Sequence, residues 1–62
     1  MDVKEIKKLL SHYKEVNQKI VLNTKGYIYY EKVGDLKEKG FYIVNNDGYK
    51  LFIAYDNVVS IK

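Results

Sequence analysis

The chain has 62 residues, a formal net charge of +3 and neither cysteine nor proline. This length predicts a single domain, residues 1–62, and the missing cysteines exclude disulfides and thiolate metal sites. The N-terminal segment is charged throughout and lacks the apolar run of a signal peptide or a transmembrane helix, so we expect a soluble, cytoplasmic protein with no membrane contact.

Residues 2–17 have the spacing of an amphipathic helix. The apolar stripe consists of Val3, Ile6, Leu10 and Tyr13, with Leu9 and Val16 widening it. Such steps of three and four residues place side chains on one face of a helix. Asp2 and Glu5 have the spacing of a capping box at its start, and Asn17 is predicted to end it. One apolar face predicts that the helix packs on another element.

From residue 19 the apolar pattern changes to the two-residue alternation of strands. We predict five short strands, at about 19–24, 27–36, 41–45, 49–55 and 58–62. Gly34 within the second strand predicts a bulge or bend, and Asp47-Gly48 is typical of a tight hairpin. The fold class is therefore mostly β with one N-terminal α-helix, and its five-stranded antiparallel sheet is long enough to curl into a small barrel.

Alternation along these strands divides the apolar residues between two faces. The inward set is expected to be Ile20, Leu22, Ile28, Tyr30, Phe41, Ile43, Leu51, Ile53 and either Val59 or Ile61. The outward set is expected to be Val21, Tyr27, Tyr29, Tyr42, Val44 and Phe52. The outward set is too apolar for an ordinary solvated face. The helix covers part of it or a partner does, and we expect a protein interface at Tyr29, Tyr42, Val44 and Phe52.

The pattern of polar residues gives little indication of catalysis. His12 is the only histidine, and Ser11 beside it on a helix points in a different direction, which makes a poor nucleophile–base pair. The carboxylates fall at predicted turns, where they commonly bond to the backbone. We predict no catalytic residue, metal, cofactor or small-molecule substrate, and hence no enzyme.

Nucleic acid is the alternative ligand. Its candidate residues are Lys25, Tyr27, Lys32 and Lys50, because aromatic rings stack on bases and lysines follow the phosphate backbone. All eleven basic residues are lysines, so the guanidinium fork that reads many bases is missing. Strand packing and protein interfaces also favour tyrosine.

A short helix followed by five strands, the second of them bent, resembles the Sm-like barrel proteins. The segments that carry this resemblance are 19–26, Gly34, 41–46 and 52–62. It implies an SH3-like or Sm-like small barrel and, as in the bacterial host-factor branch, a ring that binds RNA. The last segment is also similar to the closing strands of SH3-like domains such as YolD-like proteins. After Tyr55, Asp56 and Asn57 stand where the host-factor branch has a basic residue and a histidine that hold RNA.

Three hypotheses follow from these patterns. The first is a barrel that self-associates and binds RNA or single-stranded DNA. The second is a module for protein–protein contact, such as an inhibitor of a host protein encoded by a phage or mobile element. The third is a monomer whose helix closes the sheet. We place protein contact, including self-contact, above nucleic acid.

Overall fold

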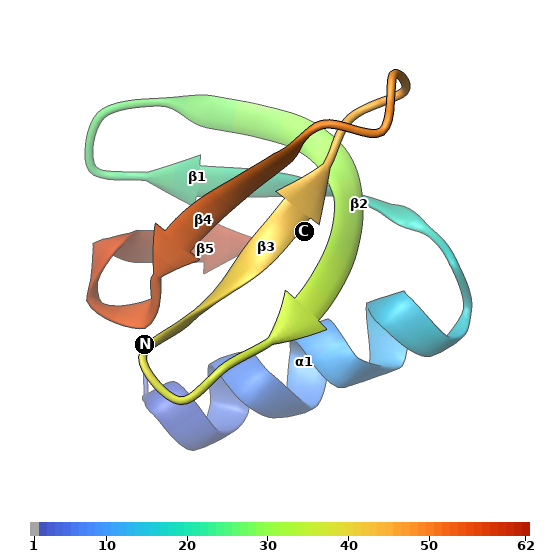
Figure 1. The fold of residues 1–62 in the computed structure, drawn as a ribbon. Coiled ribbons are helices and arrows are strands. Elements are labelled where there is room, and N and C mark those ends of the chain that lie inside the picture. Colours follow the sequence, from blue (N-terminus) through green and yellow to red (C-terminus); the bar gives the residue numbers. More distant parts are fainter. Residues whose placement is uncertain (1) are drawn as a thin grey trace.

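The computed structural model describes residues 2–62. Its elements are α1 (Val3–Glu15), β1 (Lys19–Thr24), β2 (Ile28–Leu36), β3 (Gly40–Val44), β4 (Lys50–Ala54), the 3₁₀ turn η1 (Tyr55–Asn57) and β5 (Val58–Ile61). The strands form one antiparallel sheet in the order β4-β3-β2-β1-β5, which bends around the core above α1 (Figure 1). The predicted fold class is confirmed. The sheet curls but its ladder does not close, since β4 and β5 lie at its two ends.

The helix is slightly shorter than predicted. Asp2 is its N-cap residue, but the Asp2 side chain makes no capping hydrogen bond, so the predicted capping box is wrong. The Asp2 carbonyl oxygen instead accepts a bond from the Ile6 amide at 3.0 Å. Asn17 has a φ of 55°, a left-handed conformation that asparagine tolerates better than most residues. The chain therefore leaves the helix at the predicted place.

The helix packs on the inward face of the sheet. Its buried residues Ile6 and Leu10 belong to one core with the buried strand residues, which include Ile20, Leu22, Val33, Phe41, Ile43 and Ile53. Lys14 also forms a 3.2 Å ion pair with Asp35 on β2. This hydrogen bond and the charge of Lys14 hold the pKa of Asp35 below its usual value of 3.8. The helix thus covers the core rather than the outward apolar set.

Two glycines allow strands to approach closely. The β2–β3 register shifts between Val33 and Leu36, which confirms the irregularity predicted at Gly34. A Cβ on Gly34 would lie 3.0 Å from Val44 Cγ2. A Cβ on Gly40 would overlap the carbonyl oxygen of Ile53 and come within 2.6 Å of the Phe52 ring. Glycine therefore suits both positions, because the neighbouring strand leaves little space for a side chain.

The facing predicted for the start of β2 is wrong. The β1–β2 hairpin pairs Leu22 with Tyr29 and Ile20 with Glu31, so even-numbered residues of β1 share a face with odd-numbered residues of β2. Tyr29 accordingly packs against the core, whereas Ile28 and Tyr30 are 71% and 61% exposed. Turn length sets hairpin register, and a slip of one residue exchanges the two faces.

The C-terminal elements add core residues that alternation did not predict. The expected strand 49–55 ends at Ala54, and Tyr55 begins η1. The buried Tyr55 ring stacks on Phe41 at 5.8 Å between centroids, and its hydroxyl donates a 2.6 Å bond to the Lys37 carbonyl oxygen. In β5, Ile61 packs on the core while Val59 is exposed, which decides between the two expected positions.

Tyr55 is expected to make folding sensitive to alkaline pH. Burial raises the pKa of its hydroxyl above the usual 10.0, so the unfolded chain loses this proton first. Its contribution to stability is complete below pH 10 and is lost as pH rises through the higher pKa of the folded state. Urea unfolding at several pH values should show a steeper alkaline loss for the natural protein than for Tyr55→Phe. Parallel profiles would contradict this, because the lysines titrate in both proteins.

Candidate protein interface

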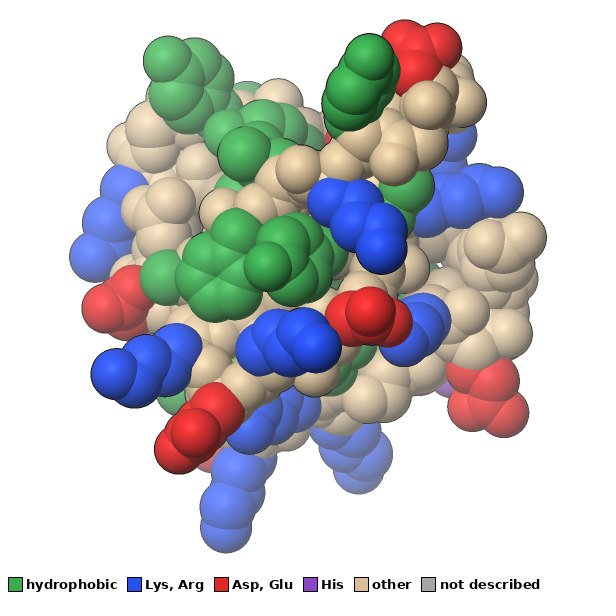
Figure 2. Space-filling model, viewed as in Figure 1, with side chains coloured by type: hydrophobic (Ala, Val, Ile, Leu, Met, Phe, Trp, Pro, Cys, Tyr) green, Lys and Arg blue, Asp and Glu red, His purple; other side chains and the backbone are tan. Residues whose placement is uncertain are grey.

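Three apolar side chains form an outward surface on β3 and β4. We name Tyr42, Val44 and Phe52 the β3–β4 patch. Figure 2 shows hydrophobic side chains gathered over these two strands, with several lysines and a few acidic side chains around them. Phe52 is 44% exposed, and Tyr42 and Val44 are half-buried. Three of the four predicted interface residues therefore lie together on one surface.

Strand register assembles the patch. Tyr42 is directly opposite Phe52 in the β3–β4 ladder, and their rings meet edge to face with centroids 5.3 Å apart. Directly opposed aromatic residues stabilise a strand pair. Val44 and Tyr42 pack over Gly34 on the neighbouring strand. The patch is thus a fixed surface that runs from β4 to the bend of β2.

Lysines border this patch on the same face of the sheet. Val44 lies between Lys32 on β2 and Lys50 on β4, and Lys32 lies opposite Lys19 on β1. Like charges in directly opposed positions repel each other. Lys32 and Lys50 therefore give one side of the patch a positive border, which favours a partner surface with acidic groups beside apolar ones, whereas the Lys19 ammonium lies over the Tyr30 ring at 5.2 Å.

The fourth predicted interface residue, Tyr29, lies elsewhere. Because it pairs with Leu22 on the inward face, it packs against the core and takes no part in the β3–β4 patch. Its ring lies 6.1 Å from that of Tyr27. Tyr29 and Tyr42 therefore lie on opposite faces of the sheet.

Both ends of the sheet have a free edge within residues 2–62. β4 pairs with β3 alone, and β5 pairs with β1 alone. An unpaired edge presents backbone N–H and C=O groups that another strand can bind. The outward side chains of β4 include Phe52, so its free edge borders the β3–β4 patch.

The nucleic-acid candidates lie in two places. Lys25 and the 70% exposed Tyr27 are at the β1–β2 turn, which the Thr24 hydroxyl holds by donating to the Tyr27 carbonyl oxygen at 2.8 Å. Lys32 and Lys50 instead border the β3–β4 patch. Tyr27 and Lys32 are five residues apart, about 16 Å along a strand. These candidates therefore do not form one continuous basic and aromatic track.

The sequence pattern did not predict the positions of two charged residues, one on each face of the sheet. Lys19 extends the lysine row across β1, and Glu31 faces inward opposite the buried Ile20. Both placements depend on the hairpin register, for which the alternating pattern contains no signal. The inward glutamate is unusual, because the other inward side chains near it are apolar.

The described part of the chain contains no group of three or more His, Cys, Asp or Glu side chains that could hold a metal ion. His12 and Ser11 are exposed on α1, and the His12 ring contacts that of Tyr13 edge to face at 5.6 Å.

No helix in residues 2–62 is long and apolar enough to cross a membrane. Comparisons with protein-family models, curated proteins and solved structures found no match.

Proposed function

We propose that the protein is a non-enzymatic binding module that acts through protein–protein contact. The partner that the structure favours is a second copy of the same chain. The observation that carries this proposal is the position of the exposed β3–β4 patch beside the free edge of β4. A strand added at this edge would continue the sheet by backbone hydrogen bonds and cover Phe52 with its side chains.

A second copy supplies a suitable strand. β5 has a free edge at the other end of the sheet, and with four residues it is one residue shorter than β4. Pairing β4 of one copy with β5 of the next uses different surfaces on the two copies, so it produces rings or open chains rather than a two-fold dimer. The resemblance to Sm-like proteins supports this arrangement, because their subunits join through the same two strands.

Chain length also favours association. A domain of about 60 residues buries only about 60% of the surface that its unfolded chain exposes, and small domains commonly gain stability by oligomerisation. Each contact between copies would bury apolar area at Phe52 and Val59, both of which are exposed. The same surface suits a larger host protein, as expected for an inhibitor from a phage or mobile element.

The second candidate function is binding of RNA or single-stranded DNA, which the lysine row beside Tyr42 and Phe52 favours. The two functions respond differently to salt. If the three lysines of this row, Lys19, Lys32 and Lys50, each contact a phosphate, raising salt from about 50 to about 200 mM should weaken single-strand binding about 20-fold. An interface of apolar side chains and strand edges should change little over this range.

The experiment that tests the proposal is sedimentation of the purified protein at both salt concentrations, recorded at 260 and 280 nm. We expect an assembly that persists at high salt with the absorbance ratio of protein alone. An assembly that carries excess 260 nm absorbance and loses it at high salt would support nucleic acid instead. A monomer under both conditions would contradict self-association.

A further inference from the structure

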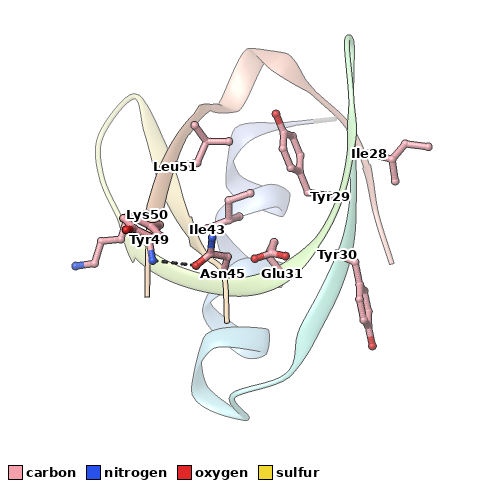
Figure 3. Close-up of a pocket in the computed structure, with 9 residues that line it drawn as sticks. All are labelled: Ile28, Tyr29, Tyr30, Glu31, Ile43, Asn45, Tyr49, Lys50 and Leu51. Atoms are coloured by element: carbon pink, nitrogen blue, oxygen red, sulfur yellow. Dashed lines mark hydrogen bonds between the residues drawn. The ribbon is translucent and has the colours of Figure 1, made fainter. Parts of the chain in front are cut away.

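The inward face of the sheet contains a second possible site, separate from the β3–β4 patch. A pocket of about 490 Å³ lies between the first half of β2 and the β3–β4 turn. Figure 1 shows these segments at the end of the molecule away from α1. Figure 3 shows Tyr29, Glu31, Ile43 and Leu51 turned toward this space, with Ile28 and Tyr30 pointing away from it. The core is therefore open at this end.

Glu31 gives the pocket its chemical character. Its side chain is half-buried and lines the pocket, and the one oxygen that is out of contact with solvent, Oε2, has no hydrogen-bond partner among residues 2–62. A buried carboxylate oxygen without a partner is unfavourable for folding. Such exceptions in native structures call for an explanation, and a bound ligand is one. An apolar side chain opposite Ile20 would avoid the cost, so an inward glutamate indicates a group that pairs with it.

The chain does not supply that group itself. In the described part of the chain the one ion pair joins Lys14 to Asp35. Lys50 lies at the mouth of the pocket, but its position opposite Val44 directs it to the outward face. The Asn45 side-chain oxygen accepts bonds from the Asp47 and Tyr49 amides, each at 2.9 Å. The Asn45 side chain therefore holds the β3–β4 turn. Glu31 is the one carboxylate among the residues that line the pocket.

The walls suit a cation on an apolar stem. Ile43 and Leu51 are opposite each other on the inward face, and the aromatic ring of Tyr29 turns toward the same space (Figure 3). Aromatic faces attract ammonium and guanidinium groups, and apolar walls accommodate methylene groups. The lining combines apolar side chains with polar groups, which suits a ligand that has a charged head and an apolar stem.

We infer that this pocket binds an organic cation, an ammonium or guanidinium group on a short apolar stem, with Glu31 as its counter-ion. The group is a lysine or arginine side chain of a partner or a free alkylamine. Because the pocket is on the inward face, the site does not depend on self-association through the β3–β4 patch.

The test is an NMR titration of the backbone amides with three probes. Nα-acetyl-lysine methylamide represents a protein side chain, n-butylamine represents a free amine, and Nα-acetyl-norleucine methylamide is a neutral control. We expect at least one cation to cause saturable shifts at Tyr29, Glu31 and Leu51, with little response to the neutral probe. Tighter binding of the lysine derivative than of butylamine would indicate a protein ligand, and comparable binding would indicate a free amine.

Two variants separate the role of Glu31 from general charge. Glu31→Gln keeps the shape of the side chain and should weaken binding of the cation about 10-fold. Glu38→Gln, in the exposed turn between β2 and β3, removes the same charge away from the pocket and should bind as the natural protein does. Equal affinity of Glu31→Gln and the natural protein, equal binding of the neutral probe, or no saturable shift with either cation would overturn the proposal.

Discussion

Phe52→Asp is expected to dissociate the assembly of copies while leaving the domain folded. Phe52 is 44% exposed on the outward face of β4, next to the free edge at which we propose that a second copy binds. A carboxylate at this position would be buried without a partner in the interface, which is strongly unfavourable. In the free subunit the same carboxylate would face water, so the core residues on the opposite face should keep their packing.

The measurement is the molar mass of both proteins over a range of concentrations, with urea unfolding to check the fold. Tyr30→Asp is the matched control, because Tyr30 is an exposed aromatic on the same outward face but lies on β2, away from the patch. We expect Phe52→Asp to be monomeric and Tyr30→Asp to assemble as the natural protein does. An unchanged mass for Phe52→Asp would show that the β3–β4 patch is not the interface.

Phe41→Ala is expected to have the largest effect on stability. Phe41 is fully buried, stacks on Tyr55 and lies opposite Ile53 in the core. Truncation of a buried phenylalanine costs about 3–5 kcal/mol, and a chain of 62 residues has a total stability of about 3–9 kcal/mol by the usual value per residue. The variant should therefore be largely unfolded or close to it at room temperature.

Phe52→Ala is the control for this prediction, because the chain has only these two phenylalanines and they lie on opposite faces of neighbouring strands. Phe52 would lose its edge-to-face contact with Tyr42, worth about 0.5–1.5 kcal/mol. Urea unfolding of both variants, measured where each is monomeric, compares the two faces directly. Similar losses for Phe41→Ala and Phe52→Ala would contradict the assignment of faces on β3 and β4.

Alternation predicted β3 and β4 well because both strands are short and regular. Phe41 and Ile43 point inward, Tyr42 and Val44 point outward, and the tight turn between the strands has Gly48 at a φ of 85°. The Asp-Gly pair indicates such a turn directly from sequence. The main part of the candidate interface is therefore predictable from the sequence.

The faces of β2 could not be predicted in the same way. Tyr27, Ile28, Tyr29 and Tyr30 are consecutive large apolar residues, so either alternate set could face the core. The choice depends on the β1–β2 register, in which Leu22 pairs with Tyr29. No residue type at this turn fixes that register. The inward position of Glu31, and with it the pocket, follows from the same register and was missed for the same reason.

Light scattering of the natural protein after size exclusion is the most direct test of self-association through the sheet. Self-association predicts a molar mass that is a multiple of the 7.3 kDa chain, that decreases on dilution and that does not depend on bound nucleic acid. A mass of 7.3 kDa at every concentration up to about 1 mM, well above the micromolar Kd of weak specific contacts, would contradict it. The β3–β4 patch would then be left to a different protein.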